Sequence, residues 1–337
     1  MLSKHDSTDT VMHQNKLIAY AYSQYLNHTP RFLDSGMVQS LAKDCGIEPT
    51  EAFLVLFSAA CGLDTAENAD HRMLERNYIR AGVQKLDAAK YREDPYYRTI
   101  RFPNQKMGKW EMKQEFYAPY EPFVFNHPIL TSALREIPQI GYFTEEFHFP
   151  AILENGVEWM TVTPNEIETM RLPIQKSCGR VLTLGLGLGY FAFCASLRAE
   201  VSSVTVIERD RDVIALMQKE LLPQFPSAEK IDIIEADAFD WMQKNDIGTR
   251  FDYVFADLWH DPSDGLDLYL QLRRIEREKN IPNIDYWIEP SLLSALRHMV
   301  YEKLKEGAAP LHLQAPIKEL LEDEFLHRLA PDLKRLN

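Results

Sequence analysis

Glycine is scarce in this sequence, cysteines are few, and basic residues are outnumbered by acidic ones. It has 14 Gly among 337 residues, whereas average usage would give about 24. The four cysteines form no C-x-x-C pair, so the sequence indicates neither a zinc ribbon nor a disulfide framework. We therefore expect reduced thiols and a cytoplasmic protein.

The charge balance and the hydrophobic runs argue against two further classes of protein. With 37 Lys and Arg against 50 Asp and Glu, the net charge is −13, which disfavours binding of nucleic acid through a basic surface. The longest uncharged run, residues 181–197, contains three glycines and divides into a strand, a turn and a helix better than it forms a membrane span. The first ten residues are mainly polar, so we expect no signal peptide there. We expect a small-molecule substrate, neutral or cationic, and no membrane partner; a homodimer is left open.

The first 122 residues predict a helical N-terminal domain that ends in an aromatic and basic cap. Apolar spacing and helix-ending residues indicate helices at 11–26, 37–45, 52–61 and 68–86. Residues 90–128 are rich in aromatic residues and prolines, and here we expect an irregular linker or cap with short strands. The Lys and Arg interleaved with aromatics in this region are also typical of RNA-binding segments. Interspersed acidic residues dilute that charge and favour a cap over a substrate pocket.

A β-hairpin bridge is predicted over residues 123–172, and a C-terminal helix over residues 310–337. Within the bridge, residues 147–160 form a hairpin that turns at Asn155-Gly156, the strongest short-range hairpin signal. Pro164 then begins a short helix. Near the end of the chain, residues 317–329 have the spacing of an amphipathic helix.

Residues 173–309 predict a Rossmann-like α/β domain. Strands are expected at residues 181–184, 203–207, 231–234, 253–256 and 284–288, and helices at 190–197, 210–222, 239–244, 266–278 and 291–305. Strands that alternate with helices require right-handed crossovers, which place the strands in one parallel sheet covered on both faces. The predicted fold class is therefore α/β.

Three of the scarce glycines, Gly185, Gly187 and Gly189, lie within five residues, where an apolar strand runs into a helix. Glycine permits φ > 0 and lets a ligand approach where a Cβ would collide. The following helix directs free N–H groups and a partial positive charge at an anionic group. Such a turn can hold NAD, FAD or S-adenosylmethionine, or it is a tight joint without a ligand. Its spacing departs from the dinucleotide pattern G-x-G-x-x-G, because Tyr190 stands in the last place.

Acidic residues follow at the ends of the later strands. Glu208 ends the second strand, where a carboxylate can accept hydrogen bonds from both hydroxyls of a ribose. Asp237, followed by Ala238, comes after the third strand, where it can accept from an adenine amino group or cap the next helix. Asp257 ends the fourth strand. In an open α/β sheet these positions share the carboxyl edge, beside the point where ligands bind.

This combination resembles the class I S-adenosylmethionine-dependent methyltransferases over residues 179–307. The matching pieces are the G-x-G-x-G turn, Glu208, Asp237-Ala238 and Asp257, in the order of the family. The resemblance implies that the glycines pass under the methionine end of S-adenosylmethionine, that Glu208 holds its ribose and that Asp237 holds its adenine. Thr183 departs from the family, because many members carry an acid two residues before the first glycine.

Asp257, His260 and Asp261 are the candidate catalytic residues. They lie in the stretch Asp-Leu-Trp-His-Asp-Pro-Ser-Asp at residues 257–264, next to the expected place of a methyl acceptor. Methyl transfer from a sulfonium is an in-line displacement, in which the protein aligns the acceptor and takes a proton. His260 is the natural base, since an unperturbed imidazole titrates near neutrality, and Asp257 can orient the acceptor or the imidazole. The alternative is an exposed turn whose acids cap the next helix.

Other functions stay open from the sequence. The hairpin and the acids after the fourth strand are similar to the spermidine-synthase group of aminopropyltransferases, but that group carries an Asp where this glycine turn has Leu188. The stretch from residue 257 to 261 is similar to one in metal-dependent catechol-type O-methyltransferases. Only Glu289 follows the fifth strand as a second ligand, so no metal is predicted. A non-catalytic cofactor-binding protein is a further alternative, whereas an NAD oxidoreductase fits the glycine spacing poorly.

Overall fold

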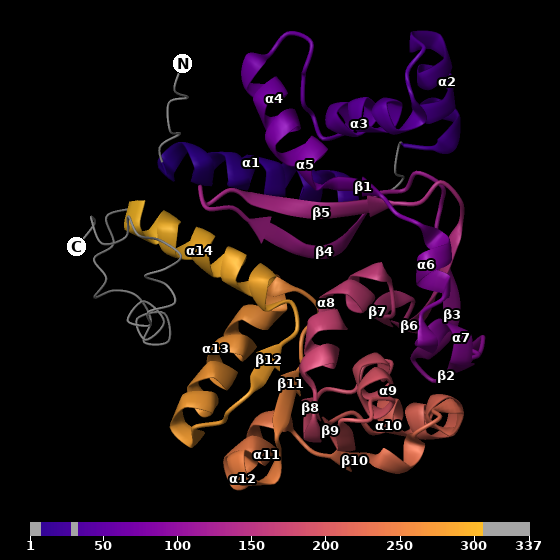
Figure 1. Ribbon diagram of the computed structural model, residues 1–337, viewed down its shortest axis with the longest axis vertical. Helices are drawn as coiled ribbons and strands as arrows, with labels where there is room; N and C mark the ends of the chain where they lie inside the picture. Colours follow the sequence, from indigo (N-terminus) through magenta and orange to yellow (C-terminus); the bar gives the residue numbers. More distant parts are fainter. Residues whose placement is uncertain (1–7, 28–32, 306–337) are drawn as a thin grey trace.

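The computed structural model describes residues 8–27 and 33–305, and this part of the chain contains three β-sheets (Figure 1). The predicted C-terminal helix at residues 310–337 lies outside the described residues. The N-terminal helices gather at one end of the molecule, and the five-stranded sheet with its helices lies at the other. Of the two remaining sheets, the one formed by β1, β4 and β5 lies between these ends, and the one formed by β2, β3, β6 and β7 lies to one side of the parallel sheet.

The five-stranded sheet is parallel throughout, which confirms the prediction for this region. Its order is β10-β9-β8-β11-β12, with β8 at Gly179–Leu184, β9 at Val201–Glu208, β10 at Ile231–Glu235, β11 at Tyr253–Ala256 and β12 at Ile284–Tyr286. The last four residues of β8 and all of β11 are buried, as expected for strands covered on both faces. The strand order reverses between β8 and β11, so the topological switch point lies between these two strands.

Helices alternate with these strands at α9 (Tyr190–Ser196), α10 (Arg211–Leu216), α11 (Ala238–Lys244), α12 (Ile247–Arg250), α13 (Pro262–Lys279) and α14 (Glu289–Lys305). The helix predicted at 210–222 is not regular. After α10 the backbone continues as a π-helix over Met217–Leu221 and as a 3₁₀ turn over Leu222–Gln224. Pro223 within that turn has no N–H for a regular helical hydrogen bond.

The second sheet is antiparallel and has the order β2-β3-β6-β7. Its strands are β2 (Gln105–Met107), β3 (Trp110–Tyr117), β6 (Phe147–Glu154) and β7 (Val157–Thr161). The β6–β7 hairpin turns at Asn155 and Gly156, which have φ values of 51° and 83°; this part of the prediction is confirmed. In residues 90–128, where an irregular linker or cap with short strands was expected, β3 is a regular strand of eight residues that pairs with β6 along its whole length. In β3, buried Trp110 and Met112 alternate with more exposed residues, which is the two-residue period of a strand. The many prolines and aromatic residues near β3 obscured this period in the sequence.

The third sheet, of order β1-β5-β4, was not expected: its first strand lies within the helix predicted at 68–86, and its other two strands lie within the hairpin bridge predicted at 123–172. It consists of β1 (Val83–Lys85), β4 (Phe123–Leu130) and β5 (Glu136–Tyr142), and it packs with α1 (Thr8–Leu26), α2 (Ser35–Cys45), α3 (Pro49–Ala60), α4 (Ala69–Leu74), the π-helix Glu75–Ile79 and α5 (Arg80–Gly82). The helix expected at 68–86 therefore ends in a strand. A Cβ on Gly82 would lie 2.0 Å from the carbonyl oxygen of Pro138, so glycine is required where the chain meets β5. Residues 123–172, expected to be a single hairpin bridge, supply strands to two sheets.

Helix α8 (Pro164–Lys176) and helix α14 join the parts of the molecule. Helix α8 contacts both β4 and α9, while α14 leaves the parallel sheet and extends beside β4 and α1 (Figure 1). Glu136 of β5 and Arg297 of α14 form a buried ion pair at this junction, with an N–O distance of 2.5 Å. Ser294 and His298 also bond the Glu136 carboxylate. Although burial opposes its charge, these partners hold the pKa of Glu136 below its usual value.

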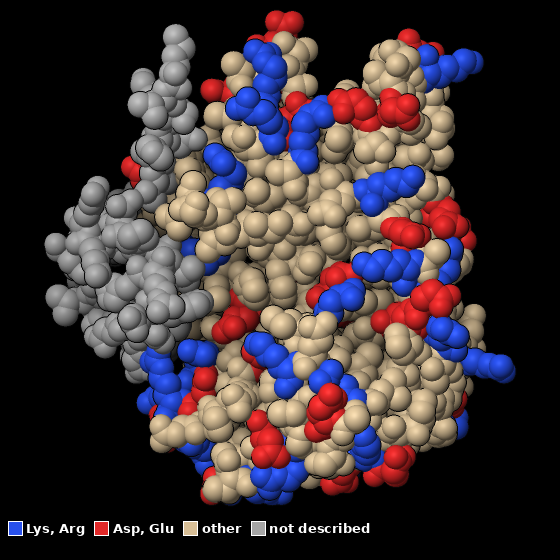
Figure 2. Space-filling view, in the orientation of Figure 1, with Lys and Arg blue, Asp and Glu red and all other residues tan. Residues whose placement is uncertain are grey.

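Within residues 8–27 and 33–305, no helix has both the length and the apolar character needed to cross a bilayer. Figure 2 shows Lys and Arg interspersed with Asp and Glu over the visible face, without a continuous basic patch. Because Figure 2 shows one face of the molecule only, the expectation that the protein does not bind nucleic acid stays a prediction.

Candidate functional site

The glycine turn connects β8 to α9 and lies against the end of β11. Its three glycines, Gly185, Gly187 and Gly189, have φ values of 93°, 52° and 74°, in the region that favours glycine. A Cβ on Gly185 would lie 1.8 Å from the carbonyl oxygen of Asp257, and the Asp257 N–H donates to Leu184 at 2.8 Å. One reason for glycine here is therefore the close approach of two strands. Over Gly187, by contrast, a Cβ would meet only Met160 Sδ, at 4.0 Å.

Glu208, at the end of β9, is hydrogen-bonded to the backbone of this turn. One carboxylate oxygen accepts from the backbone N–H of Leu186 at 3.1 Å, and the other accepts from Arg209 and Asp210 at 2.8 and 2.9 Å. The side chain is only partly buried. A fixed carboxylate at this strand end has acceptor capacity for hydroxyl groups, because each of its oxygens can accept more than one hydrogen bond.

Asp237 and Ala238 lie on the same edge, one strand farther along. The N–H of Ala236 donates to the Glu208 carbonyl at 2.9 Å, which joins the ends of β10 and β9. Asp237 is exposed and caps α11 by accepting from the Asp240 N–H at 2.9 Å, while Ala238 is buried. Helix capping, the alternative that the sequence left open, is therefore present, and the predicted contact of Asp237 with adenine stays a prediction.

Asp257 lies at the carboxyl end of β11 beside two other carboxylates. Burial, together with the nearby charges of Glu166 and Glu208, raises its pKa from 3.8 to about 8. Glu166 was not among the residues predicted for the site. It is the third residue of α8, where it accepts from the backbone N–H of Thr163 at 2.6 Å in a capping box. The pattern Thr-x-x-Glu signals such a helix start, but nothing local in the sequence relates it to Asp257.

His260 and Asp261 lie in the exposed loop after β11. The Nδ1 atom of His260 is 2.8 Å from Asp264 Oδ2, and its ring meets that of Trp159 edge to face, with centroids 4.5 Å apart. Asp261 caps α13 by accepting from the Ser263 N–H at 2.6 Å, in a capping box with Asp264. In this loop, Asp261 therefore caps α13, and the hydrogen bond to Asp264 orients the imidazole of His260. The catalytic roles of His260 and Asp261 stay predictions.

Strand β7 and the short helices of the aromatic cap cover this edge of the parallel sheet. Trp159 and Met160 of β7 reach His260 and the glycine turn, as described above. From helix α7 (Pro95–Thr99), the hydroxyl of Tyr96 donates to the Leu188 carbonyl at 2.7 Å. The hydroxyl of Tyr190 donates to Asp94 at 2.9 Å. The cap is thereby attached directly to the glycine turn.

The resulting site is acidic and partly shielded from water. Asp257, Glu166 and Glu208 come from three different elements, and the charges of the two glutamates both raise the pKa of Asp257. Such an arrangement attracts cations. In the part of the chain that the structure describes, no group of three or more His, Cys, Asp or Glu side chains is arranged to hold a metal ion.

The sequence matches no known protein family and no curated protein. Among solved structures, a spermidine synthase from Thermotoga maritima aligns with a TM-score of 0.31 and 14% identity, over 46% of this chain and 60% of that chain. A spermidine synthase in complex with the transition-state analogue AdoDATO aligns with a TM-score of 0.30 and 14% identity, over 46% of this chain and 59% of that chain. The matched region thus spans less than two thirds of either structure. This similarity is too low to assign a family, and the function proposed below rests on the site itself.

Proposed function

We propose that this chain is a transferase that uses S-adenosylmethionine as methyl donor and a neutral or cationic small molecule as acceptor. The observation that carries the proposal is the pair of carboxylates on either side of the glycine turn. Glu208 accepts from the N–H of Leu186 at 3.1 Å, and the backbone of Asp257 packs directly against Gly185. The pair lies at the carboxyl edge of a parallel sheet, next to its switch point, where ligands of such sheets bind.

The residues around the turn fit an S-adenosyl group. The nearest atom to a Cβ built on Gly187 is Met160 Sδ, at 4.0 Å. The space over this glycine is therefore open, and a ligand can approach the backbone there. By the family resemblance, Glu208 would hold the ribose and Asp237 the adenine. When bound, S-adenosylmethionine supplies an electrophilic methyl group on a positively charged sulfur. The acidic surroundings favour that charge and disfavour an anionic acceptor.

Asp257, rather than His260 as expected from the sequence, is the residue to which we assign proton transfer. Its pKa of about 8 keeps the carboxyl mostly protonated in the free protein at neutral pH. A cation bound nearby lowers that pKa again, because the opposite charge stabilises the carboxylate. The carboxylate then accepts a proton from an acceptor N–H or O–H. We assign orientation of the acceptor to His260, whose Nδ1 is paired with Asp264 and whose Nε2 is its other hydrogen-bonding atom.

Aminopropyl transfer is the second candidate. The acidic surroundings of Asp257 suit an amine acceptor, and strand β7 covers the site through Trp159. Against it, Leu188 is buried at 3% exposure, so this position of the turn offers no carboxylate for the free amine of an aminopropyl donor. Methyl transfer is therefore the stronger candidate.

Isothermal titration calorimetry with S-adenosylmethionine and S-adenosylhomocysteine tests cofactor binding. We expect a dissociation constant on the order of micromolar, in keeping with typical enzyme–substrate affinities. Glu208→Gln should weaken binding at least tenfold. The matched control is Glu235→Gln, which changes the residue paired with Glu208 on the neighbouring strand and should leave binding unchanged. Absence of binding to the wild-type protein would overturn the proposal.

Assays with candidate amines and hydroxylated small molecules then separate the two transfers. Mass spectrometry after incubation with S-adenosylmethionine or with its decarboxylated form identifies the group that is transferred. With a working acceptor, Asp257→Asn should lower turnover by about 10²- to 10⁴-fold, the usual contribution of a general base. Transfer from the decarboxylated donor alone would establish the second candidate instead. Persistent cofactor binding with no transfer to any acceptor would favour a non-catalytic role.

A further inference from the structure

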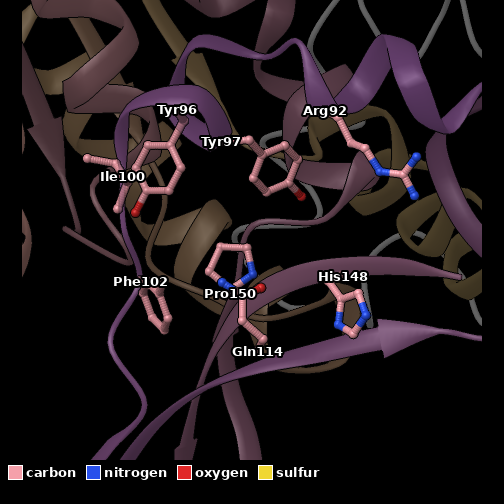
Figure 3. A pocket seen from close by; sticks show the side chains of 8 residues that line it. All are labelled: Arg92, Tyr96, Tyr97, Ile100, Phe102, Gln114, His148 and Pro150. Atoms are coloured by element: carbon pink, nitrogen blue, oxygen red, sulfur yellow. The ribbon is translucent and has the colours of Figure 1, made fainter.

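A cavity of about 250 Å³ lies between helix α7 and the antiparallel sheet, outside the site described above (Figure 3). Its apolar lining comes from Tyr96, Tyr97, Ile100, Phe102 and Pro150. Ligand pockets are typically apolar hollows with a few placed polar groups, of roughly 300 to 1,000 Å³. This cavity has that character but lies just below the range in volume, and it suits a molecule with a single ring.

Apart from the two tyrosines, the polar residues of the cavity each carry at least one N–H hydrogen-bond donor. They are Arg92, Gln114 and His148, and none of the residues that line the cavity is acidic. Arg92 and His148 converge on Glu146: Arg92 Nη2 donates to its carbonyl at 2.8 Å, and His148 Nε2 lies 2.7 Å from its carboxylate. Figure 3 shows Arg92 and His148 on one side of the view, with Ile100 and Phe102 on the other. One end of the cavity is therefore apolar, and at the other, the cationic end, Arg92 and His148 lie beside Glu145 and Glu146.

Arg92 can accept a ligand carboxylate at this cationic end. Its present carboxylate partner is Glu145, at 3.2 Å, and the two side chains are 47% and 56% exposed. An ion pair this exposed contributes little, because water and salt compete with it. A guanidinium carries five N–H donors, so a carboxylate entering from the cavity can share Arg92 or displace Glu145 into solvent.

We propose that this cavity is a binding site for a small aromatic carboxylate. The ring packs against Tyr97, Ile100 and Phe102, and the carboxylate pairs with Arg92. The inference is independent of the proposed transferase function. One wall of the site nevertheless contacts the glycine turn, because Tyr96 donates to the Leu188 carbonyl.

Benzoate is the probe for this site, with benzylamine as its cationic counterpart. Calorimetry or ligand-observed NMR on the wild-type protein should show saturable one-to-one binding of benzoate and at least tenfold weaker binding of benzylamine. Arg92→Met should weaken benzoate at least tenfold by removing the charged partner. The matched control, Arg98→Met, changes an exposed arginine of helix α7 that pairs with Glu93 and is not among the lining residues; it should leave benzoate binding unchanged.

Glu145→Gln supplies a test in which binding improves, which misfolding cannot imitate. It releases Arg92 from its exposed partner and should tighten benzoate about two- to fivefold, the range expected for one such pair. Binding should persist in Glu208→Gln, because Glu208 belongs to the other site. Four results would each overturn the proposal: no saturable binding of benzoate, equal binding of benzylamine, equal binding by Arg92→Met, or loss of binding in Glu208→Gln.

Discussion

Replacing Asp257 by asparagine is expected to stabilise the folded protein, increasingly so as the pH rises. The carboxyl has a pKa of about 8 in the folded protein, against an ordinary value of 3.8. Because the folded pKa is the higher one, the folded state keeps a proton that the unfolded state releases between these two pH values. The stabilising contribution of this carboxyl is therefore complete below about pH 4. It decreases as the pH rises from about 4 to about 8 and is constant above that. Asparagine has no such proton to lose.

The size of the effect follows from the same two values. Each pH unit within the window corresponds to about 1.4 kcal/mol, so the carboxyl lowers the free energy of unfolding by up to about 4 kcal/mol at pH 7. Urea unfolding of the wild type and Asp257→Asn at pH 5, 6 and 7 measures the difference directly. The control Asp267→Asn changes an exposed aspartate of α13 and should alter stability by less than about 0.5 kcal/mol.

The result that refutes this reasoning is a stability difference that does not change with pH, or a variant less stable than the wild type at pH 7. Either outcome would mean that Asp257 is not held in the low-dielectric, acidic surroundings on which its proposed role as proton acceptor depends. A stabilised variant that also loses turnover would identify Asp257 as a residue retained for function at a cost in stability.

Two further predictions concern the junction and the glycine turn. Arg297→Met should lower the free energy of unfolding by about 3 to 5 kcal/mol, because it leaves Glu136 buried without its main partner; urea unfolding measures this, and the double variant with Glu136→Gln should recover much of the loss. No recovery would mean that Arg297 acts mainly through its packing. Gly185→Ala should cost about 3 kcal/mol or more, since its Cβ would collide with the Asp257 carbonyl at 1.8 Å, whereas Gly187→Ala should cost only about 1 to 2 kcal/mol for its positive φ. Thermal unfolding of both variants tests this order, and equal losses would contradict it.

Much of the candidate site was predictable because its residues follow strands that are recognisable locally. Glu208 and Asp257 lie at the ends of β9 and β11, as the sequence predicted, and parallel strands bring such ends to one edge. Asp237 lies on that edge too, but its carboxylate caps α11, a role that cannot be separated from ligand binding by sequence alone. The same ambiguity holds for Asp261 at the start of α13.

The cap and the third sheet were harder to predict, for a different physical reason. Strand β1 has three residues and pairs with β5, more than fifty positions later, so its pairing rather than its own pattern makes it a strand. Residues 105–117 form half of an antiparallel sheet because β6 supplies the partner. Neither partner is visible in a local window of sequence.

The sequence by itself determined the parallel α/β sheet, the glycine turn and the β6–β7 hairpin. Each rests on a local signal: alternating strands and helices, glycines at positive φ, and Asn-Gly between two apolar runs. Only the tertiary structure decided that Glu166, a helix-capping residue of α8, lies beside Asp257 and helps to raise its pKa. The reason is that the pKa of a buried carboxyl depends on solvent exclusion and on charges from distant segments, and both arise only when those segments pack together.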